Sequence, residues 1–175
     1  MALDLVNTVV RRADPARVFD RMASAADACR FAEAATMFRE EELGSGFQFS
    51  TAPEADFVKL KELRGRIYAS FAPSAQSPAE QLSALTGLLG ASERALADAG
   101  PDSLLCQIVF SWMRLNGPEK RERLRACPAC GWLFLDKSRN GSRIWCDMAV
   151  CGNRQKSKLN YHRRHGRVRQ QAKAA

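Results

Sequence analysis

Histidine is scarce in this chain of 175 residues: there are two, His162 and His165, and none in residues 1–126. The sequence also lacks the metalloprotease, phosphate-loop and serine-hydrolase motifs HExxH, GxxxxGK and GxSxG. A cysteine used as a nucleophile needs a neighbouring base, and the first 126 residues offer no histidine for that role. The sequence therefore predicts that the protein is not an enzyme and has no catalytic residues.

Long apolar runs are missing as well. No segment approaches the roughly 20 consecutive apolar residues of a membrane span. The first ten residues carry Asp4 and Asn7 and lack the basic stretch of a signal peptide. We therefore expect a cytoplasmic protein. In that reducing compartment, clustered cysteines bind metal rather than form disulfides.

Acidic residues are nearly absent from the end of the chain. Residues 127–175 hold 11 of the 27 lysines and arginines but only two of the 19 acids, Asp136 and Asp147, which leaves this segment at +9 and residues 1–126 at −1. The first part is typical of a near-neutral globular domain. The second part is suited to a polyanion such as DNA, RNA or an anionic membrane surface.

The first 126 residues are predicted to be mostly helical. Their apolar residues recur at the three-to-four-residue spacing of an amphipathic helix, from Leu3 onward, and Gly100–Pro101 and Gly117–Pro118 indicate breaks. A short charged helix is expected from Glu119 to Arg125. The expected helix starts are Asp14–Pro15, Ser24 with Asp27 as a capping box, Pro53, and the capping box Ser77–Pro78–Ala79–Glu80.

Four of the six cysteines fall near the end of the chain with the spacing C-x2-C-x15-C-x4-C. Thiolates at this density predict a tetrahedral metal site, with Zn²⁺ as the expected ion and an iron–sulfur cluster as the main alternative. Four thiolates leave no open position, so we expect a structural ion. His162 and His165 are too far along the chain for a finger-type ligand set, and Cys29 and Cys106 are expected to be buried apolar residues. The predicted ligands are Cys127, Cys130, Cys146 and Cys151.

The turns around these cysteines predict a treble-clef-like module. Cys127–Gly131 is a knuckle that turns two thiols toward one ion. Trp132–Asp136 has a strand pattern, Asn140–Gly141 is a hairpin-turn signal, and Ser142–Cys146 is expected to be the return strand. A helix follows, with Cys151 at or near its start, where a thiolate is favoured. The predicted fold class is mainly α: a helical N-terminal domain with a small C-terminal zinc module made of a β-hairpin plus a basic helix.

Two stretches resemble a known family. CGWLFLDKSRNGSRIWC, which starts at Cys130, and CGNRQK, which starts at Cys151, closely resemble the CGNR-type zinc finger. That family usually follows an ABATE-type helical domain, and LDLVNT in residues 3–8 is similar to the opening motif of that domain. The resemblance implies a bacterial, stress-related transcription regulator whose finger binds DNA. The chain departs from the family pattern at Lys137, in place of Thr, and at Ile144, in place of a second Arg.

Basic residues gather after the last cysteine, in a helix expected to run to about residue 170 and to be roughly 30 Å long. Its apolar stripe is too narrow to pack fully into a core, so the helix either lies against a polyanion or extends into solvent. Arg139 and Arg143 flank the hairpin turn, where they would bind phosphates or offset the −2 charge of a four-thiolate zinc site. The predicted nucleic-acid-binding residues are Arg139, Arg143, Arg154, Lys156, Lys158, Arg163, Arg164 and Arg167.

The N-terminal domain has few candidate functional residues. Asp4 and Asn7 are polar points in an apolar segment and are the candidate ligand-binding residues, with a local capping and ion-pair network as the alternative. Dimerisation through the apolar helices is an equal alternative as the role of this domain. The expected organisation is an ABATE-like helical domain over 1–125, for sensing or dimerisation, a basic zinc finger over 126–170 and a tail over 171–175.

The favoured function is a bacterial transcription regulator that binds DNA through a structural zinc finger and its basic helix. One alternative is a zinc-stabilised protein-interaction module that docks a partner through Trp132, Phe134 and Trp145. The other is an RNA-binding protein, since the same charge serves RNA equally well. DNA, a second copy of the chain and an unidentified small-molecule effector are the expected partners, and no membrane is expected among them.

Overall fold

The computed structural model describes residues 1–38, 54–71, 77–97 and 99–171, with side chains given as far as Arg163 in the last helix. As predicted, most of the described chain is helical. The helices are α1 (Ala2–Val6), α2 (Ala25–Phe38), α4 (Glu54–Phe71), α5 (Pro78–Leu96), α6 (Leu104–Leu115), α7 (Pro118–Arg123) and α8 (Asn153–Gln171), with a π-helical turn η1 (Met148–Gly152) before α8. The strands are β1 (Val9–Val10), β2 (Phe19–Asp20), β3 (Leu124–Ala126) and β4 (Leu133–Leu135).

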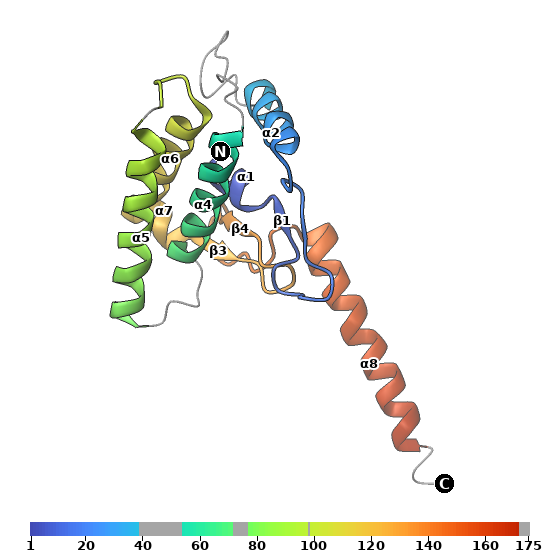
Figure 1. Cartoon of the computed structure of the whole chain (residues 1–175). Helices are drawn as coiled ribbons and strands as arrows, with labels where there is room; N and C mark the ends of the chain where they lie inside the picture. The colour runs from blue at the N-terminus through green and yellow to red at the C-terminus, as the bar shows by residue number, and fades with distance from the viewer. Residues whose placement is uncertain (39–53, 72–76, 98, 172–175) are drawn as a thin grey trace.

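The hydrophobic core forms around α1, which contacts α4, α6 and β4. In Figure 1, α4 and α5 lie side by side on one side of α1, and α2 lies on the other. Ala2, Leu5 and Val6 are fully buried, and the backbone N–H of Ala2 donates to Ser111 Oγ at 3.0 Å. A helix of five residues is not stable in isolation. Burial among the longer helices therefore holds α1 in place.

Local capping sets the starts of the longer helices. In α2, the Ser24 N–H donates to Asp27 at 2.9 Å and Ser24 Oγ accepts from the Asp27 N–H at 3.3 Å. In α5, Ser77 and Glu80 form the same reciprocal box. These two predicted starts are confirmed. The predicted start at Pro53 lies outside the described residues.

Two expectations for the first 20 residues are wrong. Val9–Val10 does not continue a helix from Leu3 but forms β1, which pairs antiparallel with β2. Asp14–Pro15 does not start a helix but lies in a turn, where the Asp14 N–H donates to the Arg11 carbonyl at 2.8 Å. Arg11 adopts a φ of 59°, a left-handed conformation that ends regular structure and reverses the chain between the two strands.

The hairpin of the C-terminal module also differs from the expected one. β4 pairs antiparallel with β3, and Ser142–Cys146 is not a strand. The charged helix consequently ends at Arg123, because the next three residues form β3. The Cys127 N–H donates to the Trp132 carbonyl at 2.8 Å, so the knuckle itself is the turn between the two strands. The predicted fold class, a helical domain with a hairpin and a basic helix beside four cysteines, is confirmed.

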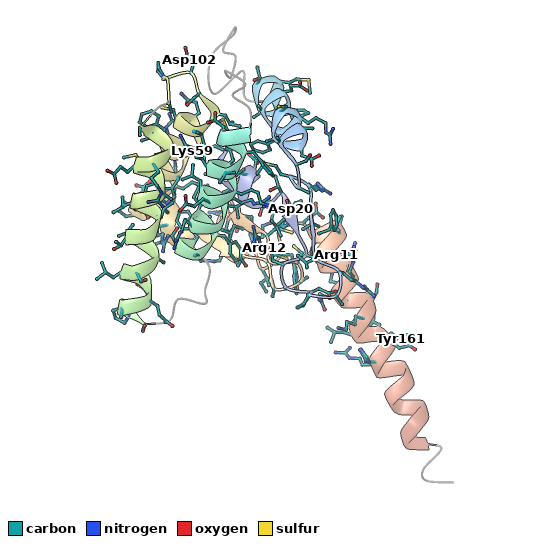
Figure 2. All side chains as sticks on the ribbon, viewed as in Figure 1. Arg11, Arg12, Asp20, Lys59, Asp102 and Tyr161 are labelled. Atoms are coloured by element: carbon teal, nitrogen blue, oxygen red, sulfur yellow. The ribbon has the colours of Figure 1, made fainter. Side chains whose placement is uncertain are left out.

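A buried ion pair fastens α4 to the β1–β2 ribbon. Arg64 on α4 is 5% exposed and donates to both carboxylate oxygens of Asp20 at 2.6 Å, and to Thr8 Oγ1 at 2.8 Å. Burial alone would raise the pKa of Asp20, but the hydrogen bonds from Arg64 and from the Met22 N–H outweigh it and the pKa is lowered. Asp20 is labelled in Figure 2, close to α4.

The last helix, α8, packs at its beginning against η1 and then extends away from the rest of the molecule toward the C-terminus (Figure 1). Among the described helices, none combines the length and the apolar character needed to cross a bilayer.

Candidate metal centre and nucleic-acid interface

Four cysteine side chains meet where the β3–β4 hairpin, the loop after β4 and η1 converge. All four sulfur atoms lie within 4.8 Å of one another; Cys130 Sγ is 3.5 Å from Cys146 Sγ, and Cys146 Sγ is 3.6 Å from Cys151 Sγ. A tetrahedral site with Zn–S bonds of about 2.3 Å places its sulfurs about 3.8 Å apart, whereas a disulfide brings two sulfurs to about 2.05 Å. The geometry fits zinc. The structural zinc ligands are Cys127, Cys130, Cys146 and Cys151.

The environment of the thiols favours a bound cation. Burial, together with the neighbouring Cys127, raises the pKa of Cys130 to about 12, and burial also raises the pKa of Cys146, which is flanked by the thiols of Cys130 and Cys151. At Cys127, backbone N–H groups, including that of Ala129, outweigh burial and lower the pKa. Because metals bind the thiolate form, a divalent cation offsets the cost of ionising these crowded groups.

The loop that carries Cys146 is organised by a buried carboxylate. Asp136 is 2% exposed and accepts hydrogen bonds from the N–H and hydroxyl of Ser138, at 2.8 and 2.6 Å, and from the Arg143 N–H at 2.9 Å. These bonds, that of the Ser138 hydroxyl foremost, lower the pKa of Asp136. The Arg143 guanidinium in turn donates to the Trp145 carbonyl at 2.8 Å and to the Cys146 carbonyl. Asp136 and Arg143 thus hold Cys146 in position for the metal.

The last ligand, Cys151, lies close to the start of α8, as predicted, but within the π-helical turn η1. The Asp147 side chain caps this turn by accepting from the Val150 N–H at 2.7 Å, and the Asp147 carbonyl accepts from the Cys151 N–H at 3.0 Å. The Met148 side chain packs over Gly152, since an added Cβ would lie 2.4 Å from Met148 Sδ. A larger residue at this position of the Cys-Gly-Asn-Arg sequence would therefore have to displace the Met148 side chain.

The zinc module is joined to the helical domain through the end of α1. Asn7 accepts from the Leu133 N–H at 3.0 Å and donates to the Leu133 carbonyl at 2.8 Å, so its side-chain amide occupies the place of a strand beside β4. Leu133 is 1% exposed and belongs to the core around α1. On the knuckle, Gly131 has a φ of 77°, and an added Cβ would lie 2.8 Å from Arg12 Cβ. The two parts are packed tightly against each other.

Arg12 and Asp4 complete the polar contacts of this first segment. Arg12, labelled in Figure 2, donates to the Val6 carbonyl at 3.0 Å, and its guanidinium lies 4.3 Å from the ring centre of Tyr68. Burial lowers the pKa of Arg12. The Asp4 carboxylate is 2.9 Å from the N-terminal ammonium. Of the two candidate ligand-binding residues, Asp4 is therefore ion-paired and Asn7 joins the two parts of the chain. Both also line a cavity.

The predicted nucleic-acid-binding residues fall into two groups. Those on α8 are exposed wherever their side chains are described, and within the described chain none of them pairs with a carboxylate. The exposed basic residues of α8 are Arg154, Lys156, Lys158 and Arg163. The side chains of Arg164 and Arg167 lie outside the described part. Beside the Asn140–Gly141 turn, Arg139 is exposed, whereas the Arg143 guanidinium is bound to backbone carbonyls.

The three aromatic residues expected to form a docking surface are largely enclosed within the zinc module. Phe134 is buried, Trp132 and Trp145 are half-buried, and all three pack against the cysteines as a small second core. The expectation of a surface built from these three rings is therefore wrong. Burial around the cysteines gives the zinc module a hydrophobic core of its own.

The structure thus defines a helical domain packed against a structural zinc finger that carries an exposed basic helix. A family model for the CGNR zinc finger matches residues 123–164. The ABATE family model, described as "Putative stress-induced transcription regulator", matches residues 1–106, which is more than half of the chain. The chain belongs to this family, whose description is that of a regulator rather than an enzyme. No curated protein is similar enough to the chain to count as a match.

Two functional roles were not foreseen from the sequence, those of Asp136 and Asn7. The sequence does distinguish Asp136, because it is one of only two acids in the basic segment. In the structure, both acids organise metal ligands. Asn7 gave a weaker signal, as a polar residue at the end of an apolar helix. Its partner lies 126 residues further along the chain, which no local pattern indicates.

Proposed function

We propose that this protein is a transcription regulator that binds DNA through α8 and the zinc module. The observation that supports the proposal most strongly is the composition and setting of α8. The helix has seven basic residues and no acidic residue, and it projects from the body of the molecule (Figure 1). Such a helix has no carboxylate of its own to pair with, so an external polyanion is its natural partner.

The dimensions of α8 suit the major groove of DNA. Its 19 residues span about 28 Å, and an α-helix with side chains is about 10–12 Å across, close to the roughly 12 Å width of the groove. Basic side chains on both sides would contact phosphates and release counterions. The zinc ion holds the start of the helix through Cys151, so the metal would orient α8 without taking part in contacts to DNA.

The test compares two triple variants that each remove three positive charges. In the first, Arg154, Lys156 and Lys158 on α8 are replaced by Ala. In the second, the control, three exposed cations outside the zinc module are replaced: Lys61, Arg66 and Lys120. Fluorescence anisotropy with a labelled DNA duplex is expected to show at least about tenfold weaker binding for the first variant and unchanged binding for the control. Equal affinities of the two variants, with zinc content intact in both, would contradict the assignment of α8.

Protein docking is a second candidate function, favoured by a different observation. Ile144, Met148 and Val150 are 61%, 49% and 52% exposed, and they lie in the zinc module close to Cys146 and Cys151. Exposed apolar side chains beside a rigid site suit an interaction surface. Binding through them would depend little on salt, which distinguishes this function from DNA or RNA binding. An RNA duplex of the same length in the anisotropy assay separates the two nucleic acids.

For the helical domain we propose effector sensing or dimerisation. Leu82 and Leu89 on α5 and Met113 on α6 are more than half exposed, which suits a contact between two copies. Sedimentation equilibrium tests this role. A monomer over the whole concentration range would leave effector sensing as the role of the domain.

A further inference from the structure

A cavity of about 370 Å³ lies at the junction between the helical domain and the zinc knuckle. Its wall includes Asp4 of α1 and Asn7, the residue that caps this helix. Phe31 of α2 and Trp132, which directly follows the knuckle, lie in the wall as well. This volume lies within the range of small-molecule sites and suits a ligand of roughly ten non-hydrogen atoms. A ligand here would contact both parts of the protein at once.

Most polar atoms in the wall already have partners. The Asn7 side chain uses both ends of its amide on the Leu133 backbone. The Thr8 hydroxyl donates to the Leu5 carbonyl at 2.7 Å and accepts from Arg64 at 2.8 Å. Neither group is left to bind a ligand without breaking contacts that hold the fold.

The carboxylates of the wall are also engaged, but one cation is not. Asp27 pairs with Arg30 and accepts the N-cap hydrogen bonds of α2, and Asp4 lies beside the N-terminal ammonium. Arg21 is exposed, and its guanidinium lies 5.9 Å from the centre of the Phe19 ring. Within the described residues, no carboxylate pairs with it. Among the charged groups of the wall, Arg21 is therefore the one that has no opposite charge beside it in the described structure.

We propose that this cavity binds a small organic acid, with its apolar body against Met22, Phe31 and Trp132 and its carboxylate paired with Arg21. The guanidinium group suits a carboxylate because it presents several N–H donors in one plane. The three apolar side chains supply the hydrophobic wall that most small-molecule sites have.

The position of the cavity links it to the metal site. The Trp132 carbonyl accepts the Cys127 N–H at 2.8 Å, which closes the knuckle, and the next residue, Leu133, is held by Asn7. A ligand that shifts Trp132 would therefore act, through this hydrogen bond, on the backbone of the zinc ligand Cys127. A role as effector site rests on the DNA-binding function proposed above, whereas binding of the acid does not.

The experiment uses the full-length, zinc-loaded protein labelled with ¹⁵N. The three tryptophan indole resonances are assigned by single Trp→Phe variants and then followed while phenylacetate or hexanoate is added up to about 10 mM, the range expected for ligands of this size. Phenylacetamide and hexanamide serve as uncharged controls. Arg21→Gln removes the proposed cation. Arg17→Gln is its matched control, an exposed arginine in the preceding turn that does not line the cavity.

We expect the acids to shift the Trp132 resonance and to leave that of Trp112, buried in the helical core, in place. The amides and the Arg21→Gln variant should bind at least tenfold more weakly, and Arg17→Gln should behave as the unmodified protein. The proposal is overturned if the acids leave Trp132 unshifted, if the amides bind equally well, or if the two arginine variants respond alike. No DNA is present in this titration. A negative result would therefore leave the DNA-binding proposal intact, and a failure to bind DNA would leave the proposal for the acid intact.

The effector role has a separate readout, the DNA affinity measured with the cavity saturated by phenylacetate. A change of threefold or more that is absent in Arg21→Gln supports this role. An unchanged DNA affinity, with binding at Trp132 intact, overturns it.

Discussion

Replacing Asn7 by Ala tests whether one side chain joins the helical domain to the zinc module. The substitution removes the two hydrogen bonds to the Leu133 backbone, at 2.8 and 3.0 Å. Each contributes about 0.5–1.5 kcal/mol net, which gives about 1–3 kcal/mol for the pair. Because Leu133 is 1% exposed, its N–H and carbonyl would be left where water has poor access. The expected loss of stability is therefore in the upper half of that range, about 2–3 kcal/mol.

Urea unfolding at pH 7 with saturating zinc, followed by circular dichroism, measures this loss. With an m value of about 2 kcal/mol/M for a chain of this size, the midpoint should fall by about 1–1.5 M. Asn116→Ala is the matched control, because Asn116 is exposed at the end of α6 and its side chain makes no hydrogen bond in the described structure. The control should change stability by less than about 0.5 kcal/mol.

Two results would refute the reasoning. The first is an Asn7→Ala variant no less stable than Asn116→Ala. The second is a loss of stability that also appears in a protein from which zinc has been removed, because the Leu133 backbone is then no longer held beside an ordered knuckle.

Three further predictions concern the metal, the knuckle and the buried ion pair. Cys146→Ser should lose zinc and disorder the module, and full zinc stoichiometry by metal analysis would contradict this. Gly131→Ala should destabilise the protein by about 1–3 kcal/mol, since its φ is 77° and the new Cβ would meet the neighbouring loop, whereas Gly65→Ala, which has free space, should be neutral or stabilising in the same thermal melts. The lowered pKa of Asp20 adds stability above the ordinary carboxyl pKa of about 3.9, and this stability is lost as pH falls through the lower folded-state value. Asp20→Asn should remove that part of the acid dependence of stability. It should also cost about 3 kcal/mol at pH 7, because it leaves buried Arg64 unpaired. A free energy of unfolding that depends on pH as in the unmodified protein would contradict this prediction.

The parts of the fold that sequence predicted correctly are those that depend on local chemistry. The capping boxes at Ser24 and Ser77 act over three residues, so the pattern alone places the starts of α2 and α5. The cysteine spacing likewise constrains the metal site, because four thiols that share one ion must converge wherever the intervening chain runs.

The parts that were mispredicted depend on partners far away in sequence. Asn140–Gly141 does form a turn, with a φ of 60° at Gly141 and its N–H donating to the Ser138 carbonyl at 3.3 Å. The following segment, Ser142–Cys146, is not a strand, because buried Asp136 binds the Arg143 N–H and draws the loop inward. β4 pairs instead with β3 on one side and is bound by Asn7 on the other.

The short α1 shows the same limit. Its apolar pattern predicts a helix, but its end at Asn7 and the change to a strand at β1 depend on contacts with the zinc module and with β2. Hydrophobic periodicity describes a single segment, so it cannot predict contacts between segments that are far apart in the sequence.

The salt dependence of DNA binding is the measurement that tests the role of α8 most directly. Anisotropy of a labelled duplex is recorded from about 50 to 200 mM salt for the unmodified protein and for the variant in which Arg154, Lys156 and Lys158 are replaced by Ala. If these three residues contact phosphates, the slope of log affinity against log salt should be steep for the unmodified protein and about 2.7 units shallower for the variant, because each lost contact removes about 0.9. Parallel slopes, or no binding at 50 mM salt, would contradict DNA binding through this helix.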